Sequence, residues 1–277
     1  GDGRSVVVVL DIVLPRRDPR TRRLAKDDIV VEAVDLCSFA SLKKFAEKYN
    51  AKGQSADVLL MNAGITAVSF ELSDDGHEKQ LQTNALSPFL LPVLLRPSLK
   101  LSSAPRVSIV SSLMSMYASP KAKAFTSESE DYIEVLDQQA NFTGLERYND
   151  TKLIVVMLAR QFAKHFPQDN LTWTSVDPGF CMSSIDRSLP SWGASILIFF
   201  RWLLGRSSEL GSRNLLWGSL AGKKDGVDGE GTYIASCKVL EPNPFLKTER
   251  GQQTEERIYK QTVELFKQIA PEQTADL

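Results

Sequence analysis

A tyrosine and a lysine four residues apart could form an acid–base pair in this chain. Tyr148 and Lys152 stand at the start of a long apolar-periodic stretch, which predicts a helix that carries both side chains on one face. A phenol keeps its proton up to a pKa of about 10, and a fixed cation nearby favours the phenolate, so Tyr148 could exchange a proton near neutral pH. Tyr117 and Lys121 have the same spacing, but Pro120 between them would interrupt the helix that aligns them.

Short apolar runs alternate with helical patterns, and these elements would have to position the pair. Such runs are typical of strands buried on both faces. The predicted strands are Val6–Leu10, Ile29–Val34, Val58–Met61, Val107–Val110, Leu171–Val176 and Gly231–Ala235, and the predicted helices are Phe39–Tyr49, Gly76–Lys100 and Tyr148–Phe166. The alternation predicts βαβ crossovers and a doubly wound α/β fold with a parallel sheet. Since no linker divides residues 1–277, we expect a single domain, with the polar stretch Lys121–Asn141 as a surface excursion.

Small or polar residues follow the carboxyl ends of the predicted strands. Open parallel sheets bind their ligands beyond this edge. The residues at these ends are Asp35, Asn62-Ala63-Gly64, Ser111-Ser112 and Asp177-Pro178-Gly179. Tyr148 opens the helix after the serine strand, so we expect the tyrosine–lysine pair and these turns to border one ligand site.

From about Val30 to about Lys267 the chain resembles the short-chain dehydrogenase/reductase family, whose members pass hydride between NAD(P) and a carbonyl or alcohol. The matching motifs are Asp35-Leu36, Asn62-Ala63-Gly64, Gln82-Thr83-Asn84, Val110-Ser111-Ser112, Tyr148 to Lys152, and Pro178-Gly179 followed by Ser183. The stretch GTYIASCKVLEPNP with its helical tail looks like the retinol-dehydrogenase-like branch, which handles lipophilic alcohols and ketones. Close relatives in that branch modify secondary metabolites.

The resemblance implies a role for each matching residue. Tyr148 would donate or accept the proton, and Lys152 would lower its pKa and hold the nicotinamide ribose. Ser112, rather than Ser111, would hold the substrate oxygen, and Asn84 would support a water relay to Lys152. The cofactor-binding residues would be Arg17, Asp35, Asn62, Gly64, Tyr148, Lys152, Pro178, Gly179 and Ser183.

Several of these residues also have a purely structural interpretation. Ser112 could cap the turn after its strand, and Asn84 could satisfy backbone groups within its own helix. Asn62 and Gly64 could form a plain tight turn, and Asp35 could be the N-cap of the helix that follows it.

The glycine-rich phosphate-binding turn of the family is missing from this sequence. Gly1 and Gly3 precede the first predicted strand, and no glycine-rich turn follows it. Alignment makes Val6–Leu10 the second strand of the family, so we expect its first strand, phosphate loop and first helix to be absent, which would leave a gap in the sheet. Arg16 and Arg17 stand where NADP-preferring relatives keep a basic residue for the 2′-phosphate. We therefore expect NADP, with NAD as the alternative, although a solvated basic loop explains the same arginines.

Composition limits the partners of this chain. A hydrophobic content of 43% and a charged content of 24% are typical of a globular protein. The net charge of −1 offers no attraction to nucleic acid, and the scattered cysteines and two histidines suggest no disulfide framework and no metal site.

The run Trp192–Leu204 is too short to span a bilayer, so we interpret it as an apolar lid that could also touch a membrane, or as ordinary core. The expected location is cytoplasmic or peripheral to an intracellular membrane.

Two functions follow from these patterns. The first is an NADP-dependent oxidoreductase acting on a lipophilic ketone, aldehyde or alcohol, in secondary-metabolite, retinoid-like or sterol-like metabolism. The alternative is a catalytically silent relative that acts only as a binding or dimerisation module. Family relatives pair through two long helices, so Gly76–Lys100 and Tyr148–Phe166 would supply the face of a homo-oligomer.

Overall fold

The computed structural model describes residues 6–12, 29–166, 170–179, 208–227 and 229–277. Arg17, Ser183 and the apolar run Trp192–Leu204 lie outside these ranges, so the predictions about them stay predictions. Within the described ranges, no helix is both long enough and apolar enough to cross a membrane.

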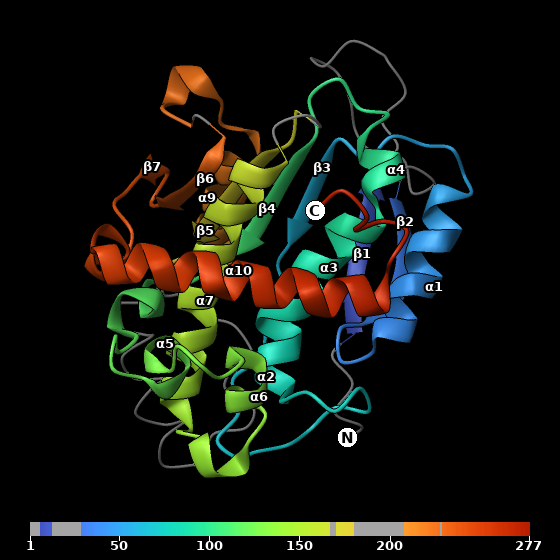
Figure 1. Cartoon of the computed structure of the whole chain (residues 1–277). Coiled ribbons are helices and arrows are strands. Elements are labelled where there is room, and N and C mark those ends of the chain that lie inside the picture. The colour runs from blue at the N-terminus through green and yellow to red at the C-terminus, as the bar shows by residue number, and fades with distance from the viewer. Residues whose placement is uncertain (1–5, 13–28, 167–169, 180–207, 228) are drawn as a thin grey trace.

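A five-stranded, mostly parallel sheet forms the centre of the molecule (Figure 1). Its strands, in spatial order, are β3 (Val58–Met61), β4 (Arg106–Val110), β5 (Thr172–Asp177), β6 (Glu230–Ala235) and β7 (Lys238–Val239). The first four strands are parallel, and β7 turns back to pair antiparallel with β6. Parallel neighbours connected through helices confirm the predicted mixed α/β fold.

The first two strands do not join this sheet. β1 (Val6–Ile12) and β2 (Ile29–Asp35) pair antiparallel with each other, with Val6 opposite Asp35. The expectation that both belong to the parallel sheet is therefore wrong. β3 ends the larger sheet, and the described residues hold no strand that could link β3 to β1 or β2. Pairing with each other satisfies the backbone groups of β1 and β2 that such a strand would otherwise bond.

The helices that surround the sheets are mostly short. The α-helices are α1 (Phe39–Asn50), α2 (Lys79–Leu81), α3 (Ser87–Leu94), α4 (Arg96–Leu99), α5 (Lys123–Thr126), α6 (Tyr132–Leu136), α7 (Leu145–His165), α9 (Ser208–Leu220) and α10 (Glu249–Ile269). A π-helical segment, η2 (Gln82–Leu86), separates α2 from α3, and 3₁₀ segments are η3 (Leu113–Tyr117), η4 (Gln139–Asn141), η6 (Lys223–Asp225) and η7 (Pro244–Lys247). The prediction of a helix from Gly76 to Lys100 is confirmed in part, because the chain is helical from Lys79 through η2 to Leu94, and α4 follows after a break at Leu95. Gly76 has a φ of 86° and lies before the helix, and a proline stands in the first turn of α4, where its missing N–H group favours a helix start.

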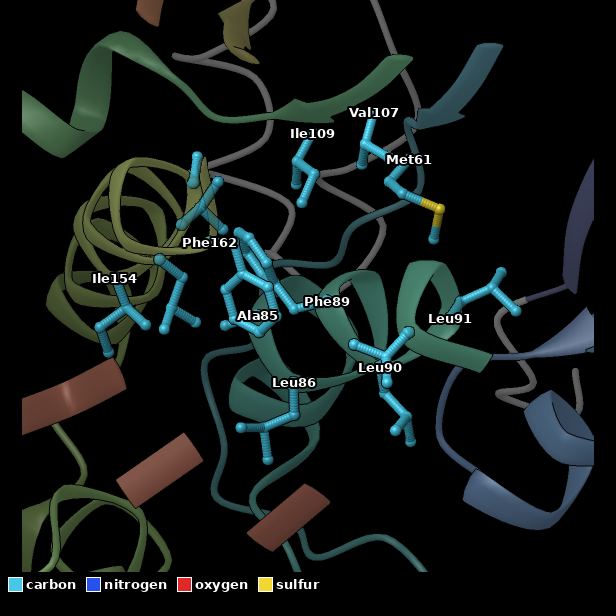
Figure 2. Packing of buried hydrophobic residues seen from close by; sticks show 14 of the residues in the cluster. Met61, Ala85, Leu86, Phe89, Leu90, Leu91, Val107, Ile109, Ile154 and Phe162 are labelled. Atoms are coloured by element: carbon cyan, nitrogen blue, oxygen red, sulfur yellow. The ribbon is translucent and has the colours of Figure 1, made fainter. Parts of the chain in front are cut away.

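Aromatic side chains join α3 and α7 to one face of the sheet. Figure 2 shows Phe89 of α3 beside Phe162 of α7, with Ile109 of β4 above them and Met61 of β3 over the other end of α3. The ring of Phe89 lies 5.1 Å from that of Phe162 and stacks at 5.8 Å on Trp173 of β5. All of these side chains are buried, so the helix that carries Tyr148 is anchored to the sheet by its apolar face.

α9 covers the opposite face of the sheet by a close backbone approach. A Cβ added to Gly218 would lie 2.6 Å from Cγ2 of Val176 on β5, so only glycine lets the helix approach this far. Val176 also packs with Ile234 of β6 in a small separate apolar cluster. The sheet is thus covered by helices on both faces, as the doubly wound prediction requires.

The C-terminal helix α10 covers the outer side of α7 (Figure 1). The ring of Tyr259 stacks on His165 at 4.4 Å, and Arg160 donates to the Glu255 carboxylate at 2.8 Å. Residues Leu153–Ala159 of α7 and all of α3 are consequently buried within one chain. α10 thus covers part of the homo-oligomer face predicted on these helices, and pairing through that face stays a prediction. Association through another surface stays a prediction.

The segment Lys121–Asn141 is not the polar surface excursion that its composition predicted. Its short helices α5 and α6 bury Phe125 and Tyr132, and the Tyr132 hydroxyl lies 2.7 Å from Oγ1 of Thr262 on α10. Four apolar residues of α6 follow a helical spacing, but the many polar residues of the segment outweighed that pattern in the sequence analysis, and α10 provides the partner surface.

Candidate active site

Lys152 is a fully buried amine held at the carboxyl end of β4. Its Nζ donates to the Val110 carbonyl at 2.7 Å, and its own carbonyl accepts a hydrogen bond from Ser111 Oγ at 3.1 Å. Only 2% of the residue is exposed. Burial lowers the pKa of Lys152 to about 8, and the nearby Asp177 carboxylate partly opposes this shift.

Tyr148 lies next to this amine on the same face of α7, as its spacing predicted. The Nζ of Lys152 lies over the phenol ring, 5.6 Å from its centroid. Tyr148 is half-buried, whereas Lys152 is enclosed. The phenol therefore lies between the buried amine and solvent, which is the arrangement that a proton-exchanging group requires.

The two serines after β4 point in different directions. Ser111 is 1% exposed and is committed to the backbone of Lys152, whereas Ser112 is only half-buried. The Ser112 hydroxyl accepts from the Met114 N–H at 3.2 Å and is the N-cap of η3. The structure thus confirms the capping interpretation of Ser112. It also leaves this hydroxyl accessible, while it removes Ser111 from any contact with a ligand.

Asn84 ties η2 to the loop after β3. Its Oδ1 accepts from the Ile65 N–H at 2.8 Å, and its Nδ2 donates to the Ile65 carbonyl at 2.9 Å and to Thr151 Oγ1 at 3.2 Å. Both amide hydrogens are therefore engaged, and the backbone groups that Asn84 satisfies lie in a distant loop, not within its own helix as the structural alternative had it. The water relay through this residue stays a prediction.

Gly64 is required by the close approach of that same loop. A Cβ added at Gly64 would lie 3.1 Å from Asn84 Oδ1 and 3.4 Å from Lys152 Nζ. These distances bring the Asn-Ala-Gly turn, Asn84 and Lys152 together at one point, as the strand-end argument predicted. Asn62, at the start of the turn, is exposed.

The turn after β5 completes this edge of the sheet. Asp177 is 5% exposed, and its Oδ1 accepts from the Gly179 N–H at 3.0 Å. Gly179 has a φ of 82°, a conformation that favours glycine. Asn214 of α9 donates to the Asp177 carbonyl and accepts from the Cys237 N–H, so α9 and the β6–β7 turn both hold this strand end. Pro178 and Gly179 thus lie at the predicted edge.

Asp35 ends β2 and closes a short turn before α1. Its Oδ1 accepts from the Cys37 N–H at 2.9 Å. The N-cap of α1 is Ser38, whose hydroxyl accepts from the Ser41 N–H at 3.2 Å, so the N-cap interpretation of Asp35 is wrong. The adenine contact predicted for Asp35 stays a prediction.

A buried ion pair beside Tyr148 was missed by the sequence analysis. Arg147 and Glu78 are both fully buried, with Nη1 of Arg147 3.4 Å from Glu78 Oε2. Arg147 also donates to the Leu136 and Asn141 carbonyls at 2.6 and 2.9 Å. Glu78 in turn accepts from the first N–H groups of α2. The position of Arg147, directly before Tyr148 and one turn before the apolar run of α7, was the available signal.

Comparison with known proteins decides the family. A family model described as short chain dehydrogenase matches residues 3–128. The short chain dehydrogenase FGM9 of Gibberella zeae is 30% identical over 250 residues, which cover 86% of this chain and 70% of that protein. This chain belongs to the short-chain dehydrogenase family. The short chain dehydrogenase/reductase dmxR8 of Cryptosporiopsis sp. is 29% identical over 265 residues, with 92% of this chain and 79% of that protein covered.

Solved structures of short-chain dehydrogenases share the fold. The NADPH-bound carbonyl reductase from chicken fatty liver superimposes with a TM-score of 0.51 at 19% identity, over 81% of this chain and 84% of that one. A protein from Mycobacterium Paratuberculosis superimposes with a TM-score of 0.59 at 20% identity, over 84% and 74%. These matches confirm the Rossmann-like architecture of this oxidoreductase family. They do not separate the retinol-dehydrogenase-like branch from others.

The described residues fit one end of a dinucleotide and not the other. A buried lysine beside a tyrosine, with an accessible serine at the same strand edge, suits the nicotinamide end, where a carbonyl would react. The pyrophosphate end needs backbone N–H groups from a glycine-rich turn. The sequence has no glycine between Gly3 and Gly53, so it supplies no such turn after β1.

Proposed function

We propose that this chain is an NADP-dependent oxidoreductase that interconverts a lipophilic ketone or aldehyde and its alcohol. The observation that carries the proposal is the buried Lys152 amine over the ring of Tyr148 at the carboxyl edge of the sheet. A buried cation is costly to the fold, and its place beside a half-buried phenol is the kind of arrangement that functional sites use to shift a pKa.

In the reductive direction, a nicotinamide cofactor supplies the hydride when it is bound. Negative charge grows on the substrate oxygen as its carbon is reduced, and the Ser112 hydroxyl donates a hydrogen bond to that oxygen. Tyr148 gives its phenol proton to the same oxygen, and Lys152 stabilises the phenolate that remains. In the oxidative direction Tyr148 takes the proton from the alcohol. Asn84 and Gly64 hold the β3 loop against Lys152 and so define the depth of the site.

NADP is favoured over NAD by two observations. Arg16 and Arg17 follow the first strand in the sequence, where a guanidinium could pair with a 2′-phosphate. The similar solved structures include a Pseudomonas aeruginosa RhlG/NADP complex and the NADPH-bound reductase named above. The lipophilic substrate, of secondary-metabolite, retinoid or sterol type, is proposed from the apolar run Trp192–Leu204.

A catalytically silent binding module is the second candidate function. It is favoured by the absent glycine-rich turn and by the Lys152 Nζ, which already donates to the Val110 carbonyl. Such a module would keep the strand-edge residues and have no affinity for a dinucleotide.

Cofactor titration separates the two functions. NADPH fluorescence is followed as the cofactor is added to the chain, with NADH in parallel. The enzyme proposal predicts saturable binding that is tighter for NADPH. No saturable binding up to millimolar cofactor would leave the silent module as the function of this chain.

Turnover then tests the role of Tyr148. With 1-tetralone as an apolar ketone, loss of NADPH absorbance reports the rate. Tyr148→Phe should abolish turnover and retain NADPH affinity. Tyr49→Phe is the matched control, because Tyr49 lies on α1 and its hydroxyl donates to the Ser55 carbonyl, and the rate of this variant should be unchanged. Retained activity in Tyr148→Phe would assign the proton transfer to another group.

A further inference from the structure

A second cavity lies beside α7, on the side of the helix away from Lys152. It has a volume of about 450 Å³ and is enclosed by the first turns of α7 together with residues 117–124 and 135–143. Tyr148, Lys152 and Ser112 do not line it. Asp150, two residues after Tyr148, is turned about 200° around the helix from it, so the cavity and the candidate active site lie on different faces.

Asp150 is the buried polar group of this cavity. It lines the cavity and is only 6% exposed. Among the described residues, none donates a hydrogen bond to its carboxylate, and no cationic nitrogen comes within ion-pair distance of it. Arg147, three residues earlier, turns its guanidinium to Glu78 and to backbone carbonyls instead. The Asp150 oxygens are not among the described side-chain atoms that are wholly buried without a partner, so the carboxylate opens into the cavity, where a ligand could pair with it.

The other groups around the cavity define the charge of that ligand. Glu146, one turn earlier on α7, is exposed and adds a second carboxylate, and Asn149 also lines the cavity. Lys123 is already paired with Glu130 at 3.3 Å, and Lys121 is exposed at the mouth. Burial and the charge of Glu146 raise the pKa of Asp150 to about 7, while Arg147 lowers it. Of the four charged residues that line the cavity, only Asp150 is buried, which favours a ligand with a positively charged donor at that point.

The walls define the body of the ligand. Ala118, Ala124, Val135 and Leu136 are buried and line the cavity, so they offer an apolar surface next to the carboxylate. A metal ion is a poorer match, because the described residues contain no cluster of three ligating side chains. A volume of this size suits a small organic molecule.

We propose that this cavity is a binding site for a small organic ammonium ion, with the nitrogen on Asp150 and a short alkyl body against the alanine and leucine wall. The site is distinct from the residues proposed for the dehydrogenase chemistry, because Tyr148, Lys152 and Ser112 do not line it.

Calorimetry with n-butylammonium chloride tests the proposal, with n-butanol as the neutral probe of equal shape. We expect saturable binding of the ammonium ion at one site, about tenfold or more tighter than that of the alcohol, because a charge-assisted hydrogen bond contributes about 1.5–3 kcal/mol. Equal binding of the two probes, or no saturable binding of the ammonium ion, would overturn the proposal without any variant.

Variants locate the binding. Asp150→Asn should weaken butylammonium by about tenfold or more and leave butanol unchanged. Ala122→Leu, which narrows the cavity without a change in charge, should weaken both probes. Glu134→Gln is the control, since Glu134 is exposed on α6 and does not line the cavity. Butylammonium affinity that is unchanged in Asp150→Asn would place the site elsewhere and refute the assignment.

Discussion

Replacing Lys152 with methionine should stabilise the chain near neutral pH. The pKa of Lys152 is about 8, against 10.5 for an ordinary lysine, and this difference costs the fold about 3 kcal/mol while both states are protonated. Methionine avoids that cost with a similar shape, but it leaves the Val110 carbonyl without its donor, which costs about 1–2 kcal/mol. We therefore expect Lys152→Met to be more stable than the unchanged chain by about 1–2 kcal/mol at about pH 7.

The advantage should disappear at higher pH. Between about pH 8 and about pH 10.5, Lys152 has lost its proton in the folded state, while the same lysine in the unfolded chain still holds one. The unfolded state then binds more protons, so the stability of the unchanged chain rises with pH through this window. By about pH 9.5 the rise from this group is about 2 kcal/mol, and Lys152→Met lacks it.

Urea denaturation of both chains at the two pH values measures this directly. The difference in free energy of unfolding between variant and unchanged chain should move by about 2 kcal/mol against the variant on going to about pH 9.5. Subtracting the two chains cancels the titration of all other groups. A difference that does not change with pH would show that Lys152 is not a desolvated cation, and would refute the reasoning. Greater stability of the variant together with lost turnover would indicate that Lys152 is kept for chemistry.

Three further outcomes follow from the packing. Arg147→Met leaves Glu78 as an unpaired buried charge and should lower the free energy of unfolding in urea by about 3–5 kcal/mol. Adding Glu78→Gln should recover part of that loss. If the effects of the two substitutions simply add, the two side chains do not form a pair. Gly218→Ala should lower the stability by about 1–3 kcal/mol, because the added Cβ meets the side chain of Val176. Combining it with Val176→Ala should reduce this loss. A loss of equal size with valine and with alanine at position 176 would contradict the close approach. Hydrogen exchange in α7 should not depend on protein concentration, since α10 covers this helix within the chain; loss of protection on dilution would instead indicate a subunit interface there.

Several features of the fold could be predicted from the sequence because they depend on local pattern. The continuous apolar runs that form β3 to β6 are typical of strands whose two faces are both covered by helices. The residues that follow these strands lie together at the carboxyl edge of the sheet, because the strands are parallel. The spacing of Tyr148 and Lys152 places them together on any helix, wherever that helix lies. These inferences need no knowledge of which distant segments touch.

Other features depended on contacts between segments far apart in the sequence. The sequence predicted β1 and β2 as strands. Their antiparallel pairing with each other depends on which other strands lie next to them, and the local sequence pattern does not specify that. Asn84 was expected to act within its helix or on water, yet it holds a loop nineteen residues away. The polar composition of Lys121–Asn141 hid a buried side that only α10 reveals.

The sequence by itself determined the family, the strand edge and the pair of groups that could move a proton, because each is encoded in residues close together along the chain. Only the tertiary structure decided that Lys152 is desolvated, that Ser112 rather than Ser111 is accessible, and that Asp150 lines a cavity without a partner. Burial and partnership are properties of the space around a side chain. That space is filled by α10, α6 and the β3 loop, whose positions follow from packing across the whole chain.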